Sequence, residues 1–246
     1  LFEIWFDGGT IPPEQGGPRI MPILARFQPD AVAFQGPPAA RNLLRWVGNE
    51  RGEAPDPCWA TTDLLTAEDG TAEKVGMGGS PAGSRWAPGE SDLPNRDQKR
   101  AFQGGWFWRA GEDDLLYSCD HLVERYYCSV GRNTNMLIGM VIDNRGLVPE
   151  ADRRRFAEFG RAVAGRFARP LARAAAPELD FGTEQEFNQA VVMEDIAHGE
   201  RILGYDLRGV RASGEAFSIA TGSCIGHKRI LRFPAVRAAR LRLEVT

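Results

Sequence analysis

A run of large apolar residues close to the start of the chain constrains the fold more than any other stretch. Five of the first six residues are apolar or aromatic, and the run ends abruptly at Asp7, Gly8 and Gly9. Such a run predicts a strand over residues 2–9 that is buried on both faces, as in a parallel sheet covered by helices. The glycines let the backbone turn away from the strand end without a side chain in the way.

Strand-like and helix-like segments then alternate along the first part of the chain. Helices are expected over residues 14–27, 113–130 and 150–168, and strands over residues 31–34, 43–47, 106–108 and 136–142. This alternation predicts a parallel sheet, and polar residues at successive strand ends favour a barrel over an open sheet. Residues 51–105 are rich in glycine, proline, serine and aspartate, so we expect an irregular segment that forms a wall of an active site.

The pattern of the sequence changes after a short hinge at residues 171–177. Short strands separated by turns are expected over residues 190–193, 201–207, 216–220, 227–233 and 240–245. This pattern predicts a small all-β sandwich. The sequence therefore predicts two domains, with part of a (β/α) barrel in residues 1–170 and a sandwich in residues 178–246 that ends within a strand.

Composition and motifs exclude several classes of function. The net charge is −3, and basic residues are interleaved with acidic ones, so we expect no nucleic-acid partner. No apolar run approaches the roughly 18 residues of a membrane span. The chain has no G-x-G-x-x-G, P-loop or G-x-S-x-G motif, which argues against nucleotide binding and serine hydrolysis. Its three histidines lack metal-ligand spacing, so we expect neither a metal nor a cofactor.

Two carboxylates at strand ends are candidate catalytic groups. Asp7 ends the first strand, and Glu50 follows the strand over residues 43–47. The carboxyl ends of barrel strands surround a common axis, and glycoside hydrolysis commonly uses two carboxylates. Trp46 lies close before Glu50, and a desolvated carboxylic acid keeps its proton to higher pH, which suits a general acid.

Pattern alone leaves other interpretations of these acids open. Asp7 begins an Asp-Gly dipeptide, which is common in turns. Glu50 could be a loop carboxylate paired with Arg45 or Arg51, and Glu90 is a rival for the acid role.

Several ordered motifs resemble the α-L-fucosidases of glycoside hydrolase family 29. They are residues 3–8 (EIWFDG), 45–50 (RWVGNE), 105–108 (GWFW), 129–135 (SVGRNTN) and 223–230 (SCIGHKRI). The resemblance covers nearly the whole chain, and it is greatest for the branch that acts on α-1,3- and α-1,4-linked fucose. It implies fucosylated oligosaccharides or glycoconjugates as substrates, and an extracellular, periplasmic or lysosomal location.

The resemblance also implies roles for individual residues. Asp7 would be the nucleophile that forms a covalent fucosyl-enzyme, and Glu50 the acid/base of a retaining mechanism. Trp5 would line the fucose pocket, and Trp106 would pack against the sugar. No cofactor is needed for this reaction.

Two further residues are candidates for substrate contact. Trp46 and Arg45 lie on the strand that leads to Glu50, where they could reach sugar hydroxyls or rings. For Arg45, a salt bridge is the alternative.

The sequence departs from the family in one respect. Family members carry additional barrel strands before the nucleophile strand, and residues 1–170 are fewer than the roughly 250 of a full barrel. We therefore expect a partial barrel with an unpaired edge at its first strand. We also expect this chain alone to hydrolyse fucosides weakly or not at all.

Two other function classes compete with this interpretation. The chain could be a carbohydrate-binding or interaction module in which the barrel part is a non-catalytic remnant. It could also be another retaining glycosidase that uses the same barrel.

Overall fold

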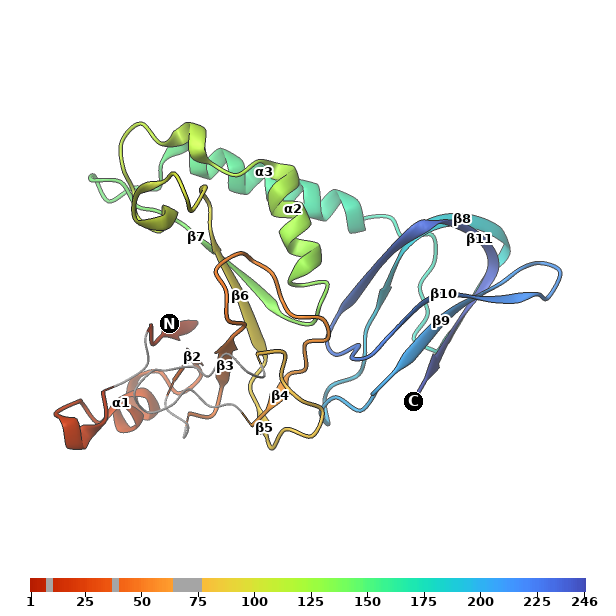
Figure 1. Cartoon of the computed structure of the whole chain (residues 1–246), viewed down its shortest axis with the longest axis horizontal. Coiled ribbons are helices and arrows are strands. Elements are labelled where there is room, and N and C mark those ends of the chain that lie inside the picture. The colour runs from red at the N-terminus through yellow and green to blue at the C-terminus, as the bar shows by residue number, and fades with distance from the viewer. Residues whose placement is uncertain (8–10, 37–39, 64–76) are drawn as a thin grey trace.

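Five parallel strands form the central sheet in the part of the chain that the computed structural model describes, namely residues 1–7, 11–36, 40–63 and 77–246. They are β1 (Glu3–Trp5), β2 (Val32–Phe34), β3 (Leu43–Trp46), β6 (Gly89–Pro94) and β7 (Asn135–Gly139). Their order in the sheet follows their order in the chain (Figure 1). Barrels are built in this way, whereas a doubly wound sheet reverses direction partway. The prediction of a mixed α/β fold with a parallel sheet is confirmed.

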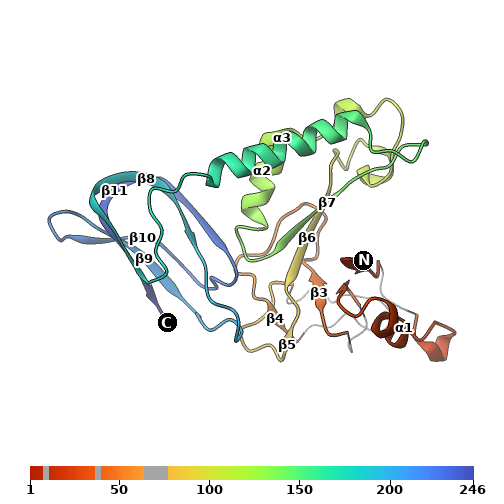
Figure 2. The same ribbon diagram turned by 180° about the vertical axis from the view of Figure 1, so that it is seen from behind.

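Three α-helices accompany this sheet among the described residues. They are α1 (Ile20–Phe27), α2 (Cys119–Cys128) and α3 (Glu150–Phe167). Figure 1 shows α3 running from the parallel sheet towards the second sheet of the molecule, and Figure 2 shows the same arrangement from behind. No helix in the described ranges is both long and apolar enough to cross a bilayer.

Two of the predicted helices are shorter than expected. The first begins at Ile20 because Gly16 takes a left-handed φ of +89° after a 3₁₀ turn over Pro13–Gln15. The second is divided into a 3₁₀ turn over Asp113–Leu115 and α2 itself. Ser118 starts α2, because its side chain accepts a hydrogen bond from the backbone N–H of His121.

The prediction of an irregular segment over residues 51–105 is wrong in its most important part. β6 lies within that segment, towards its end, and pairs with both β3 and β7 in the central sheet. A small antiparallel pair, β4 (Thr61–Thr62) with β5 (Arg85–Trp86), precedes β6. β6 was missed because its buried side chains include Glu90 and Asp92, so it lacks the apolar run that usually marks a central strand.

The predicted strand over residues 106–108 is also absent. The chain makes a 3₁₀ turn over Phe102–Gly105 with left-handed φ angles, and Trp106 itself is in the right-handed helical region. Phe107 is exposed. The indole of Trp106 covers the carboxyl ends of β6 and β7, since a Cβ built on Gly139 would come within 2.6 Å of its ring. Trp106 therefore lies over the end of the sheet, and this segment adds no strand to it.

The C-terminal part of the chain forms a four-stranded antiparallel sheet in the described structure, in the order β10–β9–β11–β8. These strands are β8 (Glu178–Val192), β9 (Tyr205–Val210), β10 (Ala216–Gly222) and β11 (Arg229–Val245). Two predicted strands, over residues 227–233 and 240–245, are the two ends of the single strand β11. Register irregularities in the pairing with β8, between Arg232 and Val236 and between Ala238 and Arg240, separate the two halves of β11.

Both halves of β11 contribute to one hydrophobic core. Leu231 from the first half is buried in a cluster with Tyr205, Leu207 and Ile225, and Leu243 from the second half packs against the same cluster. Because the sheet curves, side chains from both halves of one strand reach the same core. The two-sheet sandwich and the exact domain bounds stay predictions.

Asn133 joins the two sheets through hydrogen bonds of its side-chain amide. Its Nδ2 donates to the carbonyl oxygen of Cys58 at 3.0 Å and to Glu200 Oε1, and its Oδ1 accepts from the backbone N–H of His227 at 2.7 Å. Gly226 lies directly against it, because a Cβ at that position would be 2.2 Å from the Asn133 amide. The SVGRNTN motif therefore holds the antiparallel sheet against the parallel one.

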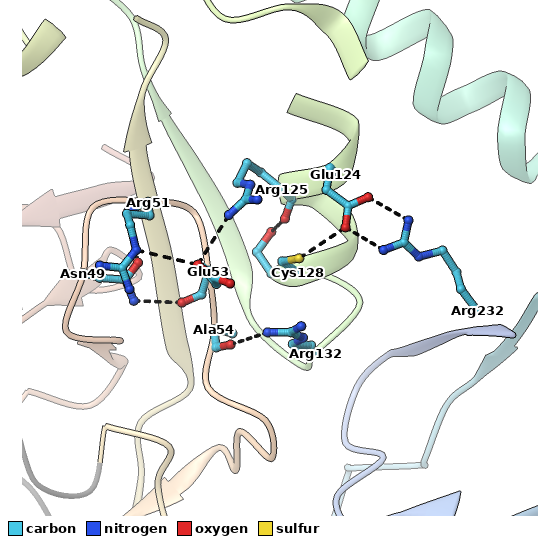
Figure 3. Close-up of polar contacts among 10 residues, drawn as sticks. Asn49, Arg51, Glu53, Ala54, Glu124, Arg125, Cys128, Arg132 and Arg232 are labelled. Atoms are coloured by element: carbon cyan, nitrogen blue, oxygen red, sulfur yellow. Dashed lines mark hydrogen bonds and ion pairs between the residues drawn. The ribbon is translucent and has the colours of Figure 1, made fainter. Parts of the chain in front are cut away.

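Helix α2 adds ion pairs on two sides of the same junction (Figure 3). Arg125 lies 3.4 Å from Glu53, and Arg232 donates two hydrogen bonds of 2.7 and 2.6 Å to Glu124. These partly exposed pairs each contribute about 0–1 kcal/mol, so they orient the helix more than they stabilise the fold.

The most deeply buried ion pair joins the loop after β6 to α3. Arg96 donates from both terminal nitrogens to the two oxygens of Asp152, at 2.7 and 2.8 Å, and both side chains are fully buried. Asp152 lies in the first turn of α3, where the helix dipole favours a negative charge. The bidentate geometry offsets the cost of removing both charges from water.

We expect the Asp152→Ala substitution to lower the free energy of unfolding by about 3–5 kcal/mol, because it leaves the Arg96 charge buried without its partner. Urea unfolding followed by circular dichroism measures this loss. Asp114→Ala removes one partner of the exposed Arg100–Asp114 pair and should change stability by less than about 0.5 kcal/mol. Equal losses in the two variants would contradict the central role of the buried pair.

A second substitution tests the junction. Gly226 and Gly214 both have left-handed φ angles, +58° and +91°, but a Cβ at Gly214 meets nothing within 4 Å. Gly214→Ala should therefore cost about 1–2 kcal/mol from backbone strain alone. Gly226→Ala should cost about 1–3 kcal/mol more, because the new methyl displaces Asn133. Thermal unfolding of the two variants checks the difference, and similar melting temperatures would refute the packing argument.

Candidate functional site

One face of the parallel sheet carries most of the candidate site residues. Strand pairing places Trp5 beside Phe34, Trp46 beside Glu90, and Glu90 beside Asn135. Directly opposed residues in neighbouring strands point to the same side of a sheet. The rings of Trp5 and Phe34 stack with their centroids 3.9 Å apart. We call this side the inner face.

Glu90 is the most buried carboxyl on the inner face. Its Oε1 accepts a hydrogen bond of 2.7 Å from Trp5 Nε1, and its Oε2 accepts one from Asn135. Burial, with a smaller contribution from the negative charge of Glu3, raises the pKa of Glu90 to about 8. Glu90 has no exposed surface. As the alternative acid/base, it would have to act from within the sheet, and its observed contacts are those of a group that orients Trp5.

Asp92 lies two residues further along β6, nearer the carboxyl end of the strand. Its Oδ1 accepts a hydrogen bond of 2.7 Å from Trp46 Nε1, and its side chain is almost fully buried. Burial raises the pKa of Asp92 to about 7, and the negative charges of Glu50 and Asp7 add to the rise. The two predicted catalytic acids therefore both lie in the electrostatic neighbourhood of Asp92, although 43 residues separate them in the chain (from 7 to 50).

Glu50 projects from a tight turn between β3 and the segment that follows. Gly48 permits the turn through a φ of +85°, and Asn49 closes it by accepting from the Arg51 backbone N–H and donating to the Glu53 carbonyl oxygen (Figure 3). The backbone N–H of Gly52 donates to the carbonyl oxygen of Asp92 at 2.8 Å. The turn is thus fixed to the adjacent strand β6.

Two side chains donate to the same oxygen of Glu50. Trp106 Nε1 lies 3.0 Å from Glu50 Oε2, and Gln98 Nε2 lies 3.2 Å from that oxygen. Trp106, which the sequence predicted to pack against a sugar, is therefore in contact with the predicted acid/base itself.

Asp7 follows β1 and is exposed. The backbone N–H of the preceding residue, Phe6, donates to the carbonyl oxygen of Phe34 at 3.0 Å, so the chain stays paired with β2 up to that point. Gly8 and Gly9, which were predicted to turn the backbone away, lie outside the described residues.

The prediction that Arg45 reaches the substrate is wrong in its geometry. Arg45 adjoins Trp46 in β3, so its side chain points to the opposite face of the sheet. There it is buried, and it donates to the carbonyl oxygens of Met77 and Trp59. Arg45 therefore anchors the segment between β3 and β6.

Three tryptophan–carboxylate pairs characterise the site. Trp5 donates to Glu90, Trp46 to Asp92 and Trp106 to Glu50. Their indoles offer flat apolar surfaces of the kind that stack on sugar rings, and each is held in orientation by one hydrogen bond. Sequence reasoning missed Asp92 and Gln98. The sequence contained a signal for Asp92: Glu90 and Asp92 are two residues apart, and residues with this spacing in a strand point to the same side of the sheet.

The described residues contain no group of three histidine, cysteine, aspartate or glutamate side chains that could hold a metal ion.

Acids and tryptophans at the carboxyl ends of sequentially ordered parallel strands are the arrangement of a barrel-type glycoside hydrolase. Comparison with known proteins gives a more specific relationship. The chain is 29% identical to α-L-fucosidase 1 of Arabidopsis thaliana, over 97% of this chain and 53% of that protein. The chain thus spans about half the length of this curated relative. No family model matches the chain.

Solved structures show the same relationship. A protein of Bacteroides thetaiotaomicron assigned as an α-L-fucosidase is 32% identical, with a TM-score of 0.89 over 100% of this chain and 57% of that one. A glycoside hydrolase family 29 member from a rumen bacterium is 28% identical, with a TM-score of 0.74 over 95% of this chain and 42% of that one. The relatives of this chain are glycoside hydrolases, and its parallel sheet is consistent with part of a barrel.

The raised pKa values predict how stability depends on pH. Glu90 and Asp92 bind protons more tightly in the folded chain than in the unfolded chain, where their pKa values are 4.5 and 3.8. Stability should therefore fall as pH rises from about 4 to about 8, because folding then requires protons that the unfolded chain has released. Glu90→Gln, which is neutral at every pH, should reduce the slope of this dependence and leave the part that Asp92 contributes.

The urea midpoint measured at intervals between pH 4 and pH 8 tests this. Glu186→Gln, which changes a carboxyl on β8 in the other sheet, is the matched control and should keep the wild-type slope. A wild-type curve that rises over this range would show that the inner-face carboxyls are not held protonated.

Proposed function

We propose that this chain carries the catalytic carboxylates of a retaining α-L-fucosidase of glycoside hydrolase family 29. The observation that carries the proposal is that Asp7 and Glu50 follow the carboxyl ends of β1 and β3 in one parallel sheet, in a chain similar throughout to proteins named α-L-fucosidases. The substrate class is glycans with terminal α-linked L-fucose, and α-1,3 and α-1,4 linkages are the ones proposed.

The proposed roles follow from exposure and hydrogen bonding. Asp7 is exposed at a strand end, where its carboxylate can attack the anomeric carbon. Glu50, which is exposed on the turn after β3, protonates the departing glycosidic oxygen. Glu50 then removes a proton from the water that attacks the fucosyl–Asp7 ester, and this step releases fucose with its original anomeric configuration.

The tryptophans of the site fit a substrate of this kind. L-Fucose has a methyl group at C6, so part of its surface is apolar and can lie against an indole ring. Trp5 and Trp46 are fixed by carboxyls behind them, so little side-chain entropy is lost when a sugar binds.

Hydrolysis of a nitrophenyl α-L-fucoside tests this proposal. We expect weak or no turnover by this chain alone. Turnover should appear when the chain is joined to the barrel strands of the Arabidopsis relative that it does not cover. In that protein, Asp7→Ala should reduce turnover to background while fucose binding is retained, because the variant removes only the nucleophile.

The matched control is Asp120→Ala, which changes an exposed aspartate of α2 and should leave turnover unchanged. Proton NMR of the first-formed fucose identifies the anomer, and an inverted product would exclude the retaining mechanism. If Asp7→Ala left turnover unchanged, Asp7 would not be the nucleophile. If the joined protein bound fucose but turned over no fucoside, the chain would be better described as a carbohydrate-binding module.

A further inference from the structure

One oxygen of Glu50 is held by two donors, and the other is not. Trp106 Nε1 and Gln98 Nε2 both point at Oε2, at 3.0 and 3.2 Å. Within the described ranges, no side chain or backbone group hydrogen-bonds to Oε1. The two oxygens of this carboxyl are therefore not equivalent.

Both donors are placed by rigid parts of the fold. The six-membered ring of Trp106 lies against Gly139 at the end of β7, where the lack of a side chain makes room for it. Gln98 follows the loop that Arg96 anchors, and its backbone N–H donates to Tyr117 Oη at 3.3 Å. Glu50 is an exposed side chain on a turn and has no comparable packing of its own.

The number of lone pairs on a carboxylate oxygen limits where a proton can bind. Each oxygen has two, and two N–H donors occupy both lone pairs of Oε2. A proton on Glu50 must then bind to Oε1. The same two donors stop the carboxyl from rotating about its Cγ–Cδ bond, since rotation would exchange the two oxygens.

We propose that Gln98 and Trp106 are positioning residues that hold Glu50 by Oε2, so that Oε1 is the oxygen that gives and takes the proton. The inference rests on the proposed function of Glu50 as the acid/base. In the first step, the Oε1–H bond breaks as the glycosidic oxygen takes the proton and the C–O bond opens. In the second step, Oε1 takes a proton from the attacking water.

Three substitutions test this through different atoms. Trp106→Phe keeps the ring but removes its N–H. Gln98→Leu keeps the size of the side chain but removes the amide. Gly139→Ala leaves both donors in place but introduces a methyl group 2.6 Å from the Trp106 ring, and so moves the indole away from Glu50.

The assay compares a disaccharide fucoside with a dinitrophenyl fucoside, in the chain joined to the remaining barrel strands. The disaccharide leaving group needs a proton, whereas dinitrophenolate leaves without one. We expect each variant to lower kcat/KM for the disaccharide about 10–100-fold, which is less than the roughly 10²–10⁴-fold of a complete loss of general acid catalysis, and to change the dinitrophenyl reaction less than about threefold. Phe107→Leu, at an exposed neighbour of Trp106, should change neither value.

Two results would overturn the inference. Equal losses with both substrates would indicate general distortion of the site, and unchanged kcat/KM in all three variants would show that the donors are dispensable. If the unsubstituted protein hydrolysed neither fucoside, the proposed function would fail and the proton-transfer role would fail with it.

The contact itself has a separate test that does not need activity. In the ¹⁵N-labelled chain, Glu50→Ala should move the indole N–H resonance that Trp106→Phe identifies, because the hydrogen bond to Oε2 is lost. The indole resonance of Trp5, which donates to Glu90, should stay in place. An unmoved Trp106 resonance would refute the contact, whatever the enzyme does.

Discussion

The buried pair between Arg96 and Asp152 is the interaction on which the geometry of the site depends most. It is the only described ion pair with both side chains fully shielded from water, and it ties the loop that leaves β6 to the first turn of α3. Two residues later, the same loop presents Gln98 to Glu50. The Arg96–Asp152 pair is costly to bury, but it fixes the direction of the loop. That direction brings Gln98 to Glu50.

The carboxyls of the parallel sheet fall into two groups. Glu90 and Asp92 lie within the sheet, where burial raises their pKa values and indole N–H groups bind them. Asp7 and Glu50 lie beyond the strand ends and are exposed. The first group can keep its protons near neutral pH and orient tryptophans, whereas the second can meet a substrate. In the proposed reaction, the exposed carboxyls at the strand ends carry out the chemistry, and the buried carboxyls within the sheet orient the tryptophans.

Sequence patterns predicted those parts of the fold that depend on apolar periodicity. β3, β7 and α3 were found within a few residues, and the strand-end position of Glu50 followed from β3. β6 was not found, because its side chains are buried through hydrogen bonds and not through hydrophobicity. The error at Arg45 was avoidable, since alternation along a strand puts neighbouring residues on opposite faces. The role of Gln98 could not be predicted, because it depends on a loop path that a distant helix determines.

The contact between Asn133 and Gly226 has a consequence for how such a molecule can be recombined. The asparagine amide occupies the space where a side chain at position 226 would lie, and it also binds the backbone on both sides of the junction. A chimera that exchanged the antiparallel sheet for one from a relative would therefore have to import the loop carrying Asn133 as well. The two segments are far apart in the chain, but they have to be exchanged together.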